Sequence, residues 1–368
     1  METISGRSRL TKALVAAGLT VTFGISLAAP AAEARTHAQS TLFLNGQGST
    51  FIQPLMARWT FLYPSMVDKS TRINYQGTGS GAGIAAFTSG LVDFAGTDAF
   101  MNDTQLKAAG GDVLHIPLTL GPVAVTYNLP GFKGNLQLDG PTLAQIYLGK
   151  VTNWNDKAIA TLNPGVTLPN QTIVPAHRAD GSGTSFIFTN YLSAVSPDFK
   201  STVGAGTLVN FPSGQGGKGT SGVASIVSQT PGGLGYVELS YALARNLPVI
   251  AIKNKDGKFV APSTAGAAAD AQNAGALPSD LRALIVNSPG AASYPITGIS
   301  WALVHQHATN QAKSYALLRF LWWAIHTGQR YSSSGTLRYA ALPANVVKLD
   351  EAKILSVTYH GKQVYSGR

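Results

Sequence analysis

Apolar positions change their spacing repeatedly along this chain, from the alternation of a strand to the 3.6-residue period of a helix. Strand-like runs over residues 41–44, 72–76 and 91–95 each lead into a polar turn, and glycine, serine and threonine dominate the first two turns. An apolar helical face from Phe51 to Leu62 follows the first turn, and residues 84–87 read as helix after the second. Strand, glycine turn and helix in succession predict an α/β fold with largely parallel sheets.

Two extended stretches divide the chain. Residues 113–127 are apolar but include Pro117, Gly121 and Pro122, which favours an extended conformation throughout, and residues 294–297 form a second extended segment. A chain of 368 residues indicates two domains, because single cores stop growing near ~250–300 residues. If both extended stretches cross from one domain to the other, one domain is built from both ends of the chain and the other from its middle. Further elements are expected as helices over 139–147, 155–162 and 186–192, a strand over 172–174, and an alanine- and glycine-rich excursion with a helix over 261–276.

The first 34 residues have the pattern of an export signal. Arg7, Arg9 and Lys12 precede an apolar stretch over 13–29, and Ala32-Glu33-Ala34 supplies the small-residue cleavage pattern. A retained membrane anchor is the alternative, but about 17 residues interrupted by threonine and serine are marginal for spanning a bilayer. The sequence therefore predicts a cleaved signal peptide over 1–34 and a periplasmic location.

Composition narrows the chemistry. The chain has no cysteine, which excludes disulfides, thiolate metal sites, a cysteine nucleophile and a lipid-anchored cysteine. Its formal net charge is +10 with only 12% charged residues, and the basic residues are scattered rather than clustered. That distribution favours an anionic partner held at a local site and argues against a nucleic-acid track.

Three glycine turns are candidate anion sites. Residues 49–50, 78–80 and 181–184 each lie between a strand and a helix start, where the first N–H groups of a helix have no internal partner. A small tetrahedral anion can accept those hydrogen bonds, although serine and threonine are also ordinary helix caps. Arg178 and Asp180 precede the third turn, so a guanidinium oriented by a carboxylate could hold an anion there. A surface ion pair is the alternative for these two residues.

Four other chemistries match parts of the sequence less well. Residues 77–82 match the dinucleotide pattern G-x-G-x-x-A, with Asp98 at the distance of a ribose-binding acid, but export argues against that cofactor. Gly217-Lys218 is followed by Gly219, which rules out a Walker loop. Ser182 near His177 would suit a serine hydrolase, yet G-S-G-T-S is not the G-x-S-x-G elbow. A metal site at residues 305–307 would need accompanying acids that the sequence does not supply.

Taken together, these motifs resemble the PstS family, the periplasmic phosphate receptors of ABC importers. The resemblance covers essentially the whole mature chain and is carried by these segments: GQGSTF (46–51), YQGTGSGAGI (75–84), VDFAGTDA (92–99), LDGPTLAQIYLGKVTNWND (138–156), HRADGSGTSFIFTNYL (177–192), GGLGYVE (232–238), YPITGISW (294–301) and LRYAALPANVV (337–347).

The resemblance implies an α/β, two-lobed periplasmic-binding-protein fold of type II, each lobe a mostly parallel sheet flanked by helices, with two hinge crossings. Lobe I would comprise residues 35–119 and 296–368, and lobe II residues 120–295. One departure is Gln47-Gly48-Ser49, where the family often has Ala-Gly-Ala. By motif match, the phosphate-binding residues would be Thr50, Phe51, Ser80, Asp98, Arg178, Ser182, Gly183 and Thr184, with Asp180 bracing Arg178.

An aspartate in an anion site makes chemical sense for phosphate. Phosphate near neutral pH keeps at least one proton, which Asp98 can accept, whereas sulfate has none and meets bare like charge. The resemblance therefore implies a phosphate receptor without enzymatic activity, cofactor or metal, acting as a monomer that delivers phosphate to membrane permease subunits. An exported phosphoester hydrolase using Ser182, and a receptor for sulfate or another oxyanion, remain the alternatives.

Overall fold

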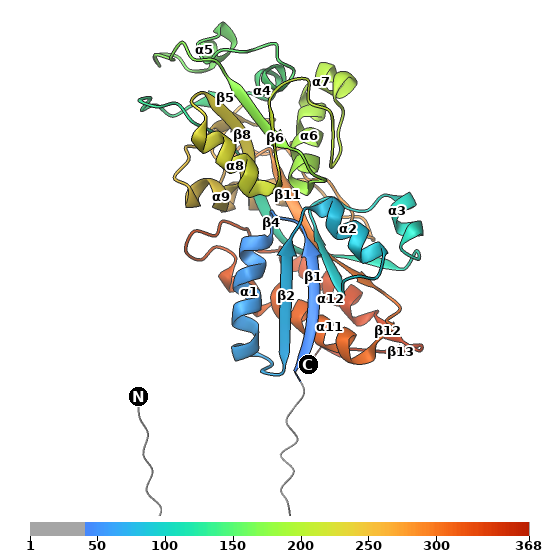
Figure 1. Ribbon diagram of the computed structural model, residues 1–368. Helices are drawn as coiled ribbons and strands as arrows, with labels where there is room; N and C mark the ends of the chain where they lie inside the picture. Colours follow the sequence, from blue (N-terminus) through green and yellow to red (C-terminus); the bar gives the residue numbers. More distant parts are fainter. Residues whose placement is uncertain (1–40, 368) are drawn as a thin grey trace, which may run out of the picture. The chain divides into compact units, whose positions relative to one another are not determined.

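A computed structural model describes residues 41–367, and the predicted signal peptide lies outside these residues. The main feature of the described part is an eight-stranded sheet with the order β2-β1-β3-β11-β4-β8-β6-β7 (Figure 1). Its strands are β1 (Leu42–Gly48), β2 (Thr71–Gly77), β3 (Phe94–Thr97), β4 (Val113–Tyr127), β6 (Val174–Arg178), β7 (Gln215–Gly217), β8 (Gly233–Glu238) and β11 (Thr297–His305).

The long strand β4 joins two groups of strands. Its first part pairs antiparallel with β11, from Val113 opposite His305 to Pro122 opposite Thr297. Its second part, from Val123, pairs antiparallel with β8. Strand β11 also pairs antiparallel with β3, and the outer pairs are parallel, β1 with β2 and β3 on one side and β6 with β7 and β8 on the other. The sheet is therefore mostly parallel towards its edges, as the α/β prediction required.

Strand β4 covers the whole stretch that the sequence predicted to be extended, residues 113–127. Proline cannot donate a ladder hydrogen bond, so a proline in a central strand calls for a local irregularity. The ladder between β4 and β11 shifts register between Ser300 and Trp301, where Trp301 lies opposite Pro117. The extra residue of this bulge is Leu118 in β4, so the irregularity lies directly beside Pro117 and interrupts the side-chain alternation of β4.

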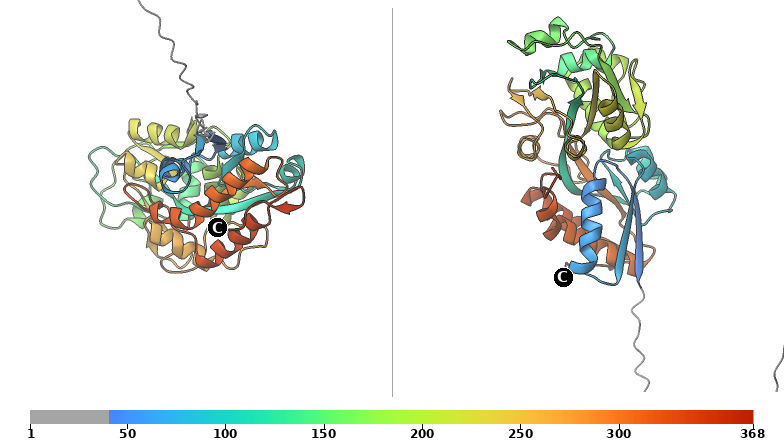
Figure 2. Two further views of the ribbon diagram at one scale, coloured as in Figure 1. Left: turned by 90° about the horizontal axis from the view of Figure 1, so that it is seen from below. Right: turned by 60° about the vertical axis from the view of Figure 1, so that its left-hand side comes forward.

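Helices cover both groups of strands. Helices α11 and α12 pack on β4, and α11 also contacts β1 (Figure 2), while α8 packs on β6, β7 and β8. The helices are α1 (Gln53–Met66), α2 (Ser80–Thr88), α3 (Asp103–Ala108), α4 (Gly140–Tyr147), α5 (Lys157–Leu162), α6 (Gly183–Val195), α7 (Pro197–Thr202), α8 (Gly219–Gln229), α9 (Leu239–Ala244), α10 (Thr264–Asn273), α11 (Gln311–Ile325) and α12 (Ala344–Leu355), with a 3-10 helix η1 (Thr327–Tyr331).

Two small sheets complete the described structure. One contains β5 (Gln137–Leu138), β9 (Ala251–Lys253) and β10 (Phe259–Val260), and the other pairs β12 (Thr358–Tyr359) with β13 (Lys362–Gln363). Buried tryptophans anchor the surrounding core: Trp59 donates its indole N–H to the Gly328 carbonyl at 2.8 Å, and Trp154 donates to the Gly232 carbonyl at 3.1 Å. Each indole nitrogen therefore has the partner that burial requires.

Element boundaries differ from the predictions at several places. Helix α1 begins at Gln53 instead of Phe51, because the Ser49 side chain accepts hydrogen bonds from the turn that precedes the helix. Strand β3 begins at Phe94 instead of residue 91, since only the later residues pair with β1. Helix α6 begins three residues earlier than predicted, at Gly183, because Ser182 caps it. The lobe boundaries near residues 119–120 and 295–296 stay a prediction.

Candidate functional site

Four helix starts converge on one buried place in the sheet. Helices α1, α2, α6 and α8 each follow a strand of a parallel pair, namely β1, β2, β6 and β7. The first N–H groups of a helix lack internal partners, and the helix dipole puts partial positive charge at this end. Ligands of open α/β sheets bind at the carboxyl ends of such strands.

Hydrogen bonds join these helix starts, although the strands that precede them lie towards opposite ends of the sheet. Thr50 Oγ1, before α1, lies 2.8 Å from Thr220 Oγ1 in the first turn of α8. The Gly81 N–H, in the first turn of α2, donates to the Gly181 carbonyl at 2.9 Å. A Cβ atom on Gly81 would lie only 3.0 Å from the Gly181 Cα, so glycine permits this close approach. Residues from three predicted turns thus share one site.

Arg178 and Asp180 form a bidentate pair. Arg178 Nε donates to Asp180 Oδ1 at 2.7 Å, and Nη2 donates to Oδ2 at 2.5 Å. The Gly219 N–H also donates to Asp180 Oδ1 at 3.0 Å. Burial opposes ionisation of Asp180, but the hydrogen bonds and charge of Arg178 lower its pKa below the usual value. The Arg178 side chain is 1% exposed, so this is not a surface ion pair of little energetic value.

The start of α6 presents polar groups without internal partners. Ser182 Oγ accepts from the Ser185 N–H at 3.0 Å, the arrangement of an N-cap. The N–H groups of Gly183 and Thr184, the first two of the helix, have no partner inside the helix. Thr184 Oγ1 is buried and has no hydrogen-bond partner among residues 41–367. A buried hydroxyl without a partner is costly in a folded protein and calls for an explanation.

Asp98 is the buried acid of the site, at 1% exposure. Ser49 Oγ donates to its Oδ2 at 2.5 Å, Ser300 Oγ donates to its Oδ1 at 2.5 Å, and Ser80 Oγ lies 3.4 Å from Oδ2. Burial raises the pKa of Asp98 to about 6, and the hydrogen bonds from Ser300 and Ser49 limit that rise. A carboxylate held among donors is poised to accept a proton shared by a bound ligand.

Glycine at position 183 allows α6 to approach this acid. A Cβ atom there would lie 2.6 Å from Asp98 Oδ2 and 2.5 Å from Ser80 Oγ, both well inside van der Waals contact. Ser80, Asp98 and Gly183 are therefore adjacent, as their assignment to one binding site requires. The Phe51 N–H, which is predicted to bind the ligand, donates to Ser49 Oγ at 3.0 Å.

Several residues of the site were not among those predicted from the sequence. Thr220 Oγ1 accepts from Arg178 Nη1 at 3.3 Å, and the Thr220 N–H donates to Thr50 Oγ1 at 3.2 Å. The segment Gly217-Lys218-Gly219 is not a Walker loop but a fourth glycine turn between a strand and a helix. Ser300 lies in the segment 294–301 that carries the family resemblance, but its contact with Asp98 depends on pairing between strands that are distant in the chain, which local sequence patterns do not indicate.

Buried groups next to the site connect its two sides. Tyr339 Oη donates to the Phe51 carbonyl at 2.6 Å and lies 3.1 Å from Glu238 Oε2. Tyr241 Oη donates to the Thr50 carbonyl at 2.7 Å. Burial raises the pKa of Glu238 to about 8. These contacts fix the turn at residues 50–51 against β8 and α9.

The alternative chemistries fare less well in this geometry. The His177 ring stacks on Phe211 at 4.7 Å, and its Nδ1 lies 3.2 Å from the Arg178 carbonyl, so it is engaged away from Ser182. His305 Nδ1 lies 3.0 Å from Asp112 Oδ1. Within residues 41–367 no group of three or more histidine, cysteine or acidic side chains could hold a metal ion. The Gly81 N–H already donates to the Gly181 carbonyl, so it is not free to bind the pyrophosphate of a dinucleotide.

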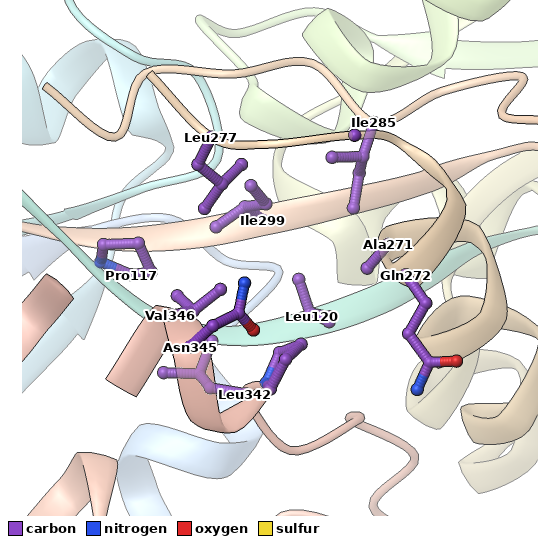
Figure 3. A pocket seen from close by; sticks show the side chains of 12 residues that line it. Pro117, Leu120, Ala271, Gln272, Leu277, Ile285, Ile299, Leu342, Asn345 and Val346 are labelled. Carbon is purple, nitrogen blue, oxygen red and sulfur yellow. The ribbon is translucent and has the colours of Figure 1, made fainter. Parts of the chain in front are cut away.

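A separate cavity of about 160 Å³ lies between β4, β11, α10 and the start of α12 (Figure 3). Apolar side chains such as Leu120, Ile299 and Val346 line it, and Gln272 and Asn345 supply amide groups. No charged residue contributes to the lining, so this cavity does not suit an oxyanion.

None of the described helices is both long and apolar enough to cross a bilayer.

Comparison with known proteins agrees with this geometry. A family model described as a PBP superfamily domain matches residues 29–326. The phosphate-binding protein PstS of Xylella fastidiosa (strain 9a5c) is 42% identical over 311 residues, covering 84% of this chain and 84% of that protein. The chain belongs to the PstS family. PstS of Pasteurella multocida is 39% identical over 84% of this chain and 89% of that protein, and PstS of Methanocaldococcus jannaschii is 37% identical over 84% and 85%.

Solved structures related to this PstS-family chain share its fold. A phosphate binding protein from Stenotrophomonas maltophilia aligns with a TM-score of 0.61 at 19% identity, over 85% of this chain and 93% of that chain. A high affinity periplasmic phosphate-binding protein bound with phosphate aligns with a TM-score of 0.66 at 19% identity, over 84% and 92%. These neighbours confirm the expected periplasmic-binding-protein fold, although identities this low say nothing about ligands.

Proposed function

We propose that this protein binds inorganic phosphate with high affinity outside the inner membrane and delivers it to the permease of an ABC-type phosphate importer. The observation that carries the proposal is a buried carboxylate, Asp98, facing a site otherwise composed of donors and Arg178. Such a site matches an oxyanion that is negatively charged yet carries a proton. The curated relatives bear the name phosphate-binding protein, which supports the same ligand.

The donor groups suit a small tetrahedral anion. Arg178 supplies charge and Asp180 fixes its orientation, while the helix starts supply backbone N–H groups. Hydrogen bonds to charged groups are worth ~1.5–3 kcal/mol each, so a few of them reach the ~8 kcal/mol of micromolar binding. The proposed ligand residues are Thr50, Phe51, Ser80, Asp98, Arg178, Ser182, Gly183 and Thr184. The Phe51 N–H would stay bonded to Ser49 Oγ and share its hydrogen with a phosphate oxygen.

Enclosure of the ligand would follow from closure of lobe I on lobe II. The hydrogen bonds Thr50–Thr220, Gly81–Gly181 and Tyr241–Thr50 each join a residue of one predicted lobe to a residue of the other. Such contacts complete a dry site, in which charge-assisted hydrogen bonds are stronger. The proposed receptor acts as a monomer in the periplasm, after removal of residues 1–34, and needs no cofactor or metal.

Calorimetry tests the proposal directly. Protein without residues 1–34 is unfolded and refolded to remove bound ligand, then titrated with phosphate and with sulfate. We expect one-to-one phosphate binding and no sulfate heat. Asp98→Asn should keep an anion site but lose most of the preference for phosphate over sulfate, because the amide no longer repels a proton-free oxyanion. An unchanged preference in Asp98→Asn would contradict the role of this acid.

The same preparations separate the alternatives. A hydrolase using Ser182 would turn over a chromogenic phosphate ester and lose that activity in Ser182→Ala. A general oxyanion receptor would bind sulfate and phosphate with similar affinity. The buried N-cap role of Ser182 favours binding over catalysis, since its hydroxyl already accepts from the Ser185 N–H.

A further inference from the structure

Ser49 holds a position that no assigned ligand role explains. Its Oγ accepts from the Phe51 N–H at 3.0 Å and from the Ile52 N–H at 3.3 Å. The same oxygen lies 2.5 Å from Asp98 Oδ2. Ser49 is buried at the carboxyl end of β1, so solvent does not compete for these contacts.

These three contacts fix the direction of the Ser49 proton. A serine hydroxyl has one O–H donor and two acceptor lone pairs. Both lone pairs face backbone N–H groups, which can only donate, so the O–H must point to Asp98. A proton on Asp98 Oδ2 would face a hydroxyl that has no lone pair left to accept it. Ser49 therefore favours the ionised form of Asp98 at this oxygen.

Other groups around Asp98 act on the same equilibrium. Ser300 Oγ donates to Oδ1 at 2.5 Å, and the Arg178 charge also favours ionisation. Glu238 is coupled to Asp98, but burial raises its pKa to about 8, which keeps it uncharged near pH 6. Burial likewise raises the pKa of three nearby phenols, which stay neutral there: Tyr75, Tyr241 and Tyr339. Among these neighbours, Ser49 is the one whose hydrogen-bond direction is fixed by the backbone.

We propose that Ser49 is a specificity-determining residue that keeps Asp98 an acceptor, and so extends the preference for a protonated over a proton-free oxyanion to lower pH. This inference rests on the proposed function of the site. Once Asp98 is protonated it can donate to sulfate, and the discrimination falls. Loss of the Ser49 hydroxyl should bring that change to a higher pH. Ser49 touches Asp98 and is not itself required to touch the ligand.

The Asp98 carboxyl can be followed directly. The 13Cγ resonance of Asp98, assigned with Asp98→Asn, is titrated between pH 5 and 9 in ligand-free refolded protein. We expect Ser49→Ala to raise the midpoint by about one pH unit, the equivalent of one lost hydrogen bond to a charged group. Ser49→Thr keeps a hydroxyl and should restore the original midpoint. Ser332→Ala is the matched control, because Ser332 is equally buried and its Oγ donates to Gln329 instead, at 2.7 Å.

Selectivity is then measured on the same variants. As the pH is lowered, the ratio of the sulfate to the phosphate dissociation constant falls when Asp98 becomes protonated. This fall should begin at a higher pH in Ser49→Ala than in the original protein or in Ser332→Ala. An unchanged Asp98 midpoint in folded Ser49→Ala would overturn the inference, and so would a shifted midpoint without a shift in selectivity. If the original protein bound no phosphate, the proposed function would fail, while the carboxyl titration would still decide whether Ser49 controls Asp98.

Discussion

The substitution Thr184→Val tests whether the Thr184 hydroxyl binds the ligand or stabilises the fold. Valine has nearly the shape of threonine but no hydroxyl, and Thr184 Oγ1 is buried without a partner among the described residues. Removing a buried polar group that makes no hydrogen bond should not destabilise the ligand-free protein and should stabilise it by ~1 kcal/mol. Removing a hydrogen bond to a charged ligand should cost about 1.5–3 kcal/mol of binding, or roughly a 10- to 150-fold weaker affinity for phosphate.

A second threonine on the same helix gives the opposite expectation. Thr189 Oγ1 donates to the Ser185 carbonyl at 2.7 Å and accepts from the Gly206 N–H at 3.1 Å. Thr189→Val should therefore lower the free energy of unfolding by about 1–3 kcal/mol and leave phosphate affinity nearly unchanged.

Denaturant unfolding of ligand-free protein and calorimetric titration with phosphate measure the two quantities separately. If Thr184→Val lowered stability and kept its affinity, the hydroxyl would have a structural role and the assignment of α6 to the ligand would be wrong. Equal losses of affinity in both variants would point to a general disturbance of the helix, which would also refute the reasoning.

Further predictions follow from neighbouring contacts. Gly183→Ala places a Cβ atom 2.6 Å from Asp98 Oδ2, so calorimetry should show at least ~100-fold weaker phosphate binding, whereas Gly206→Ala, with its nearest contact at 3.4 Å, should bind normally. Asp180→Asn leaves the Arg178 fork without its charged partner and should weaken phosphate binding about tenfold in the same assay. Glu238 has a folded-state pKa near 8, above its usual value, so the folded state binds more protons and stability should fall as pH rises from 5 to 8; Glu238→Gln should flatten this fall in thermal unfolding.

Local signals in the sequence predicted much of the architecture. The run 113–127 is one strand, and Asp139 caps α4 by accepting from the Thr142 N–H at 2.9 Å, because both features depend on residues close in the chain. The three glycine turns lie between strands and helix starts, as predicted. The boundary of α1 was misplaced because the Ser49 side chain satisfies the N–H groups of the turn before it.

The rest of the site depends on partners that are far apart in the sequence. Ser300 reaches Asp98 only because β11 pairs with both β3 and β4, and β4 is bulged beside Pro117. Thr220 could not be predicted from its own turn, because its contacts with Thr50 and Arg178 join residues that are 170 and 42 positions apart. Tyr339 and Glu238 meet across 101 residues of chain, and no periodicity or motif in the sequence indicates that contact.

The shared strand β4 also has a consequence for the order in which the chain can fold. Every strand of the group β4-β8-β6-β7 comes from residues 113–238, so this half of the sheet can assemble early during synthesis. The strands β1, β2 and β3 are made first, but they reach β4 only through β11, which ends at His305. Strands β1, β2 and β3 can therefore join β4 only after β11, one of the last strands, has been synthesised. Contacts between residues so distant in the chain form slowly, so the joining of the two halves of the sheet is a slow step.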